Sequence, residues 1–171
     1  RQIVVMLKPP LPHLSKTRLS AGLGRVKAMK IARETTRKTL RAAQDSRWQL
    51  TAYITPNRYL GETFGGLWPA DMPRTSQGRG DLTARLNKAL REAAPGPILF
   101  IGADAPELSK ALIWQGFRAL RSHDAVFGPA TDGGFYLFGL RKKTFTPSPF
   151  APVRWSTEFA MADDADREEQ K

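Results

Sequence analysis

The sequence predicts an α/β fold, a mostly parallel sheet with helices on both faces. Continuous apolar runs at residues 3–7 and 98–101 are typical of strands that are buried on both sides. Residues 25–43 instead carry apolar side chains at helical spacing. Strands that alternate with helices favour parallel pairing, so we expect one α/β domain spanning residues 1–171.

The first half of the chain contains two predicted strands around one helix. Residues 3–7 form the first strand, and a Pro-rich loop follows from residue 8 to residue 15. Helix 25–43 places Val26, Met29, Ala32, Thr36, Leu40 and Ala43 on one face and Lys27, Lys30, Arg37, Lys38 and Arg41 on the others. Residues 48–55 form the second strand, and residues 56–74 are expected to be irregular.

The second half continues the alternation. Asp81 is a helix N-cap before an apolar face made by Leu82, Leu86, Ala89, Leu90 and Ala93, and Ser109 caps a helix after strand 98–101. Residues 125–127 and 135–140 form the late strands. Their connection is too short for a parallel crossover, which predicts a late antiparallel excursion.

Composition narrows the function classes. The chain has no cysteine and two histidines, which argues against disulfides, thiolate chemistry and His-based metal or triad sites. The apolar runs are shorter than a membrane span, and we expect a cytoplasmic protein. The net charge is +11, and residues 1–47 hold twelve Lys and Arg against two acids. That segment predicts a polyanionic partner, although a solvated helix face is the alternative.

Three basic residues follow the first predicted strand. Lys8, Lys16 and Arg18 surround a loop stiffened by prolines, where they could converge on phosphate groups. The glycine spacing of a P-loop is missing. A loop with solvated cations is the alternative.

A glycine-rich loop and two acidic positions lie at later strand ends. In segment 76–82, Gln77 is a candidate to read a base edge, and Gly80 with Asp81 leads into a helix N-terminus that attracts anions, although Asp81 could be only a cap. Asp104 follows strand 98–101, where a carboxylate can bind Mg²⁺. Glu107 is either a second ligand or the start of the next helix.

The segment 126–140 is the most informative part of the chain. Two apolar runs flank a turn in which Asp132 precedes two glycines, so the backbone can approach a ligand closely. We expect Thr131, Gly133 and Gly134 to bind substrate and Asp132 to orient the acceptor or hold a metal ion. A hairpin turn in which the Asp bonds its own backbone is the alternative.

Four motifs occur in order, at residues 8–19, 102–108, 128–140 and 155–158. Together they resemble a bacterial family of GT-A-type glycosyltransferase-like proteins, which is similar to phospholactate guanylyltransferases and, more distantly, to molybdenum-cofactor nucleotidyltransferases. The resemblance spans nearly the whole chain. It implies a Rossmann-like nucleotide-diphospho-sugar transferase fold, a nucleotide near the first loop, and Mg²⁺ or Mn²⁺ at Asp104.

The chain departs from that family pattern in two places. Family members usually have Gly where this chain has His13, whose side chain could narrow the approach of a phosphate. A paired Asp-x-Asp is also missing, because position 102 is Gly and position 106 is Pro. Metal binding would then recruit Asp132 or Glu107.

These features predict a transferase that moves a nucleotidyl or glycosyl group from a nucleoside triphosphate or nucleotide-sugar to a small-molecule acceptor. Lys16, Arg18 and Asp132 are the expected catalytic residues. The rivals are a non-catalytic nucleotide- or nucleic-acid-binding module and a degenerate family member acting in protein interaction. Residues 1–47 contain no Phe, Tyr or Trp, which makes nucleic acid the weaker partner because single-strand binders stack bases on aromatics.

Overall fold

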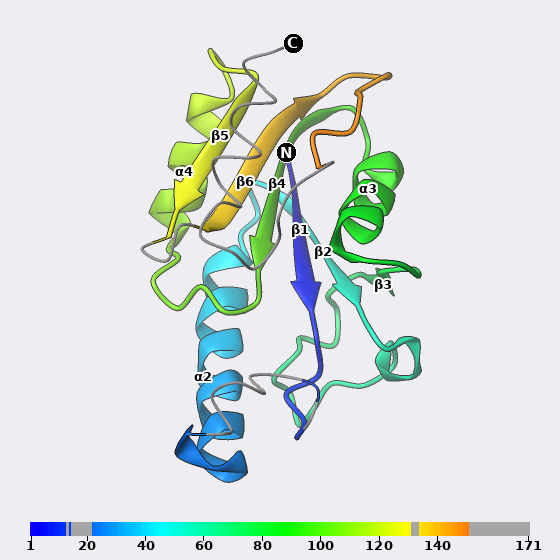
Figure 1. Cartoon of the computed structure of the whole chain (residues 1–171). Coiled ribbons are helices and arrows are strands. Elements are labelled where there is room, and N and C mark those ends of the chain that lie inside the picture. The colour runs from blue at the N-terminus through cyan, green and yellow to red at the C-terminus, as the bar shows by residue number, and fades with distance from the viewer. Residues whose placement is uncertain (13, 15–21, 131–133, 151–171) are drawn as a thin grey trace.

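The structure is a computed structural model that describes residues 1–12, 14, 22–130 and 134–150. Its centre is a six-stranded sheet in the order β3-β2-β1-β4-β6-β5 (Figure 1). The strands are β1 Gln2–Leu7, β2 Gln49–Ile54, β3 Arg74–Ser76, β4 Gly96–Gly102, β5 Ala125–Pro129 and β6 Phe135–Lys142. The predicted fold class is confirmed.

The sheet is mostly parallel, and its one reversed strand is β6. β1 pairs in parallel with β2 and β4, and β2 pairs in parallel with β3. β6 runs antiparallel to both β4 and β5, which confirms the late antiparallel excursion. The carboxyl ends of β1 to β5 and the amino end of β6 therefore lie at one edge of the sheet, which we call the carboxyl edge.

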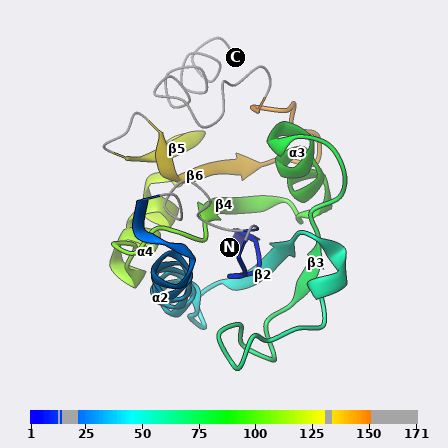
Figure 2. The same ribbon diagram turned by 60° about the horizontal axis from the view of Figure 1, so that its bottom comes forward.

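Helices cover both faces of the sheet. α2 Arg25–Ala43 and α4 Lys110–Ala119 lie on one face, and α3 Leu82–Glu92 lies on the other (Figure 2). The predicted N-caps are confirmed: the side chain of Asp81 accepts from Ala84 N at 2.8 Å, and that of Ser109 accepts from Leu112 N at 3.2 Å.

The alternation of side chains along each strand divides the core into two clusters. Ile3, Val5 and Leu7 face α2 and α4, whereas Val4 faces α3. β4 repeats the pattern, with Leu99 and Ile101 on the first face and Ile98 and Phe100 on the second. Both faces of the central strands are apolar, as the continuous runs in the sequence predicted.

Two expectations were wrong in detail. Residues 56–74 were predicted to be irregular throughout, but the segment contains a 3-10 helix at Asn57–Tyr59 and ends in the short strand β3. Arg74 donates to Pro69 O at 2.6 Å and Arg33 to Phe64 O at 3.0 Å, so arginine side chains satisfy carbonyls that lie outside regular structure. Val26, predicted on the same face of α2 as Ala32 and Leu40, is 63% exposed, because the buried face begins at Ala28 and Val26 points away from it.

Candidate functional site at the carboxyl edge of the sheet

The strand register brings the predicted residues of three loops into one row. Leu7 pairs with Ile54, which pairs with Ser76, so Lys8 and Gln77 leave the sheet at the same level. Met6 pairs with Gly102 on the other side, which places Asp104 at the level of Lys8. Adjacent strands lie about 4.8 Å apart. The acidic loop thus begins beside the first loop, and the glycine-rich loop begins at the same level one strand farther along, with the end of β2 between them.

The buried side chain of Gln77 connects the start of the glycine-rich loop to the ends of β1 and β2. Its side chain is 3% exposed, and its Nε2 donates to Leu7 O at 3.1 Å and to Tyr53 O at 2.9 Å. Its Oε1 accepts from Arg85 Nη1 at 3.2 Å. Both amide N–H groups are therefore committed to the backbone. This geometry opposes the expectation that Gln77 reads a base edge, and it makes Gln77 a positioning residue for the end of β1.

Two cations of α3 hold the glycine-rich loop in place. Arg85 Nε donates to Gly80 O at 3.0 Å, and Lys88 Nζ donates to Ser76 O at 2.9 Å. Lys88 also pairs with Glu92 at 2.7 Å. Arg85 and Lys88 were not predicted from the sequence, although they lie one and two turns after the N-cap Asp81, at a spacing that places them on one helix face.

Gly80 and Asp81 have structural roles in this loop. Gly80 has φ +94°, and a Cβ there would lie 2.8 Å from Ala84 Cβ, so only glycine fits without strain. Asp81 caps α3, as the alternative reading of the sequence had it. Contact of either residue with a nucleotide stays a prediction.

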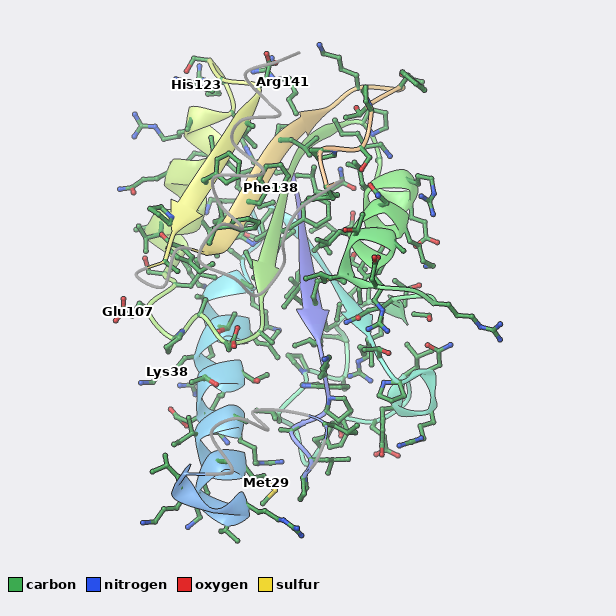
Figure 3. All side chains as sticks on the ribbon, in the orientation of Figure 1. Met29, Lys38, Glu107, His123, Phe138 and Arg141 are labelled. Atoms are coloured by element: carbon green, nitrogen blue, oxygen red, sulfur yellow. The ribbon has the colours of Figure 1, made fainter. Side chains whose placement is uncertain are left out.

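The acidic loop places Asp104 at the strand end and Glu107 farther out. A Cβ at Gly102 would lie 3.1 Å from Asp104 Oδ1, so the carboxylate lies against the end of β4. Asp104 and Glu107 are both exposed, and Glu107 points away from the molecule and from the end of β1 (Figure 3). That orientation disfavours Glu107 as a second ligand to a metal at Asp104.

No cluster of three or more acids or histidines that could hold a metal occurs within residues 1–12, 14, 22–130 and 134–150. Among the described acids at the row of loops, Asp81 caps α3 and Glu107 points away from the end of β1 (Figure 3), which leaves Asp104 as the candidate ligand. The predicted partner ligand, Asp132, lies outside the described residues, as do His13, Lys16, Arg18, Thr131 and Gly133.

The end of β5 and the start of β6 lie at the same edge of the sheet. Ala130 N donates to Gly134 O at 2.8 Å, which closes the turn across the two strands. Gly128 leaves room for a neighbouring ring, because a Cβ there would lie 2.7 Å from Tyr136 Cζ. Gly134 thus stands at the carboxyl edge together with Lys8, Gln77, Gly80, Asp81 and Asp104.

Tyr53 of β2, whose carbonyl accepts from Gln77, has a perturbed acidity. Tyr53 donates through its hydroxyl to Glu92 Oε2 at 3.1 Å. Burial, followed by the charge of Glu92, raises the pKa of the Tyr53 hydroxyl well above its usual range. The hydroxyl therefore stays protonated near neutral pH and donates to Glu92, so Tyr53 supports α3 and is not a candidate for proton abstraction.

Comparison with known proteins agrees with this geometry. Residues 38–157 match the model of a family described as "Uncharacterized protein conserved in bacteria (DUF2064)". The chain belongs to this family. The match includes Gln77 and Asp104, whereas Lys8, Lys16 and Arg18 precede it.

Solved structures extend the comparison. The chain is similar to a crystal structure from Desulfovibrio desulfuricans G20 that carries the provisional name nucleotide-diphospho-sugar transferase. The two share 27% identity at a TM-score of 0.88, over 99% of this chain and 75% of that one. The predicted nucleotide-diphospho-sugar transferase fold is therefore confirmed, and the likeness supports a transferase as the general kind of protein.

A second structural match is weaker. The 4-diphosphocytidyl-2C-methyl-D-erythritol synthase of Anaerococcus prevotii DSM 20548 shares 14% identity at a TM-score of 0.47, over 74% of this chain and 53% of that one. A likeness at that level carries no conclusion. No curated protein matches the sequence. In the described part of the chain, no helix is both long and apolar enough to span a membrane.

Proposed function

We propose that this protein is a transferase that moves a nucleotidyl or glycosyl group from a nucleoside triphosphate or nucleotide-sugar to a small-molecule acceptor. The observation that carries the proposal is the row of loops at the carboxyl edge, where Lys8 lies beside the acidic loop of Asp104 and the glycine-rich loop begins at the same level beyond β2. In open α/β sheets, ligands bind outside the carboxyl ends of the strands.

Lys8 is the described cation of the phosphate site. It is exposed at the end of β1, next to Leu7, whose carbonyl is held by Gln77 and by Thr55 N at 3.2 Å. Lys16 and Arg18 follow in the same loop of the sequence and complete the proposed site. Positive charge fixed beforehand where negative charge develops is usually the largest single contribution to catalysis.

The glycine-rich loop suits the nucleoside. Gly78 and Gly80 both have positive φ, and Arg85 and Lys88 hold the loop from α3. The backbone of residues 76–81 is therefore held by the protein's own hydrogen bonds, and positions 78 and 80 carry no side chain. The N-terminus of α3 adds a partial positive charge at the same place.

Asp104 suits a divalent cation that is held jointly with substrate. Mg²⁺ prefers oxygen ligands and is commonly bound by one or two carboxylates together with substrate phosphates. One exposed carboxylate beside a cationic loop matches that mode better than a protein-only cage. When bound, the ion would act as a Lewis acid and a template for the phosphates. Asp132 would contribute the second ligand or orient the acceptor, with Thr131, Gly133 and Gly134 beside it.

A panel of ligands tests this function. Nucleoside triphosphates and nucleotide-sugars are added to the protein with and without Mg²⁺ or Mn²⁺, and the melting temperature is measured. A ligand at 100 times its dissociation constant adds about 2.7 kcal/mol of stability. We expect at least one nucleotide to stabilise the protein, with a larger shift when the metal is present.

Matched variants separate metal from nucleotide. Asp104→Asn should remove the increment that depends on metal and keep the shift that does not. The control is Asp124→Asn, which changes an exposed acid just before β5 on the opposite edge. It should keep both the shift in melting temperature that depends on metal and the shift that does not. Incubation of the stabilising donor with candidate acceptors then distinguishes a transferase from a non-catalytic binding module, since only the former releases nucleotide or pyrophosphate. No stabilisation by any member of the panel would contradict the proposal.

A further inference from the structure

A cavity of about 470 Å³ lies at the edge of the sheet opposite the candidate site. It is bounded by the last turns of α3, by Lys142 at the end of β6 and by residues 144–148. The segment after β6, orange in Figure 1, folds back beside α3. Because β6 runs antiparallel to β4, this cavity is separated from the carboxyl edge by the length of the sheet.

Lys142 brings a buried positive charge to this cavity. It is 9% exposed, and its Nζ donates to Arg91 O at 2.9 Å and to Ala93 O. These carbonyls belong to the C-terminal end of α3, so the ammonium stabilises the negative end of that helix. Two of the three N–H bonds are used in this way, which leaves one for another partner.

The charge of Lys142 has no acidic partner among the described residues. None of their ion pairs includes it, and the described lining of the cavity contains a second cation, Arg91, and no carboxylate. Burial also lowers the pKa of Lys142, because desolvation disfavours the charged form. Buried charges in proteins are normally paired. An anion in the cavity would supply the missing charge.

The remaining walls favour a ligand with an apolar body. Leu90 and Pro147 line the cavity, and the ring of Phe145 beside them is 83% exposed. Asn87 adds one half-buried amide. The volume falls in the range of small-molecule sites, which combine apolar walls with a few polar groups.

The outer wall is held by hydrogen bonds of its own. Thr146 Oγ1 accepts from Lys143 N at 2.8 Å and donates to Lys143 O at 3.2 Å, and Thr83 Oγ1 donates to Phe150 O at 3.1 Å. Phe150 is fully buried, which anchors the end of the segment. Less conformational entropy is lost on binding to such a wall than to a disordered loop.

We propose that this cavity binds a small organic anion, a carboxylate or a phosphate monoester, with its charged group at Lys142 and Arg91 and its apolar body against Phe145. The site is independent of the proposed nucleotide site, because it shares no residue with the carboxyl edge. Its position behind α3, the helix that holds the glycine-rich loop, suits an effector site more than a substrate site.

Benzoate, phenyl phosphate and neutral benzamide test the proposal by NMR titration of the ¹⁵N-labelled full chain. We expect benzoate and phenyl phosphate to give saturable shifts at the amides of Asn87, Arg91 and Phe145, and benzamide to give none. Arg91→Gln should weaken benzoate binding about tenfold, the loss of one charged hydrogen bond. The matched control Arg118→Gln, an exposed cation of α4, should change it less than about twofold.

Further measurements keep the result decisive. Phe145→Ala should weaken both aromatic probes and leave their response to Arg91→Gln intact, and a saturating nucleotide should not displace them. Equal binding of benzamide, equal losses in the two arginine variants or no saturation by benzoate would overturn the proposal. So would benzoate binding only when Asp163, Asp164 and Asp166 are changed to Asn, because the chain's own carboxylates would then be the occupant.

Discussion

The replacement Gln77→Leu tests how the row of loops is held. Leucine is similar in size to glutamine, so it fills the buried position without a polar group. It removes two donated bonds, to Leu7 O and Tyr53 O, and the bond accepted from Arg85. A hydrogen bond of this kind contributes about 1 kcal/mol net, so we expect a loss of roughly 2–3 kcal/mol in unfolding free energy. For a chain of this size that corresponds to roughly 4–12 °C in melting temperature.

The replacement should also weaken nucleotide binding, because Leu7 O is the carbonyl that fixes the backbone in front of Lys8. The assay is urea unfolding followed by circular dichroism, combined with calorimetric titration of the best nucleotide. Gln115→Leu, at an exposed position of α4, is the matched control and should change neither quantity appreciably. If the unfolding free energy of Gln77→Leu lies within about 0.5 kcal/mol of the wild-type value, the hydrogen bonds of the amide do not stabilise the row of loops.

Three further substitutions have expected outcomes. Gly139→Ala should lower the free energy of unfolding in urea by roughly 1–3 kcal/mol, because its Cβ would overlap Leu99 Cδ2 and lie 2.8 Å from Val126 Cγ2. An unchanged midpoint of urea unfolding would refute this packing. Lys16→Ala should weaken nucleotide binding by about 1.5–3 kcal/mol in calorimetry with little change in stability, and equal affinity would remove Lys16 from the site. His13→Gly should tighten nucleotide binding at both about pH 5.5 and about pH 8 if the side chain obstructs the phosphate. Weaker binding confined to the lower pH would show instead that the imidazolium assists, because its ordinary pKa is about 6.5.

Much of the fold follows from local patterns in the sequence. The run at residues 98–101 could be recognised as a strand because both of its faces are apolar, and both N-caps could be recognised from Asp81 and Ser109. Strand β3 was missed since it has three residues and pairs with β2 alone, which leaves no periodicity to detect. Its existence depends on a partner that is distant in sequence.

The sequence was sufficient to predict where the candidate site lies, but less so to predict the role of each of its residues. The position of Asp104 after a buried strand was sufficient to place it at the carboxyl edge. Gln77 could not be assigned correctly, because the acceptors of its amide, Leu7 O and Tyr53 O, are 70 and 24 residues away along the chain. The cavity at Lys142 gave no sequence signal, since the carbonyls that surround the ammonium belong to another element.

Nucleotide affinity of Lys8→Gln tests the central claim most directly, because Lys8 is the one of the three predicted phosphate-binding cations that the structure describes. The control is Lys38→Gln, an exposed lysine of α2 whose side chain points away from β1 (Figure 3). The two proteins have the same net charge, so titration calorimetry at one ionic strength compares position alone. The account predicts about tenfold or weaker binding for Lys8→Gln and binding within about twofold of wild type for Lys38→Gln. Equal affinities in the two variants would contradict a phosphate site at the end of β1.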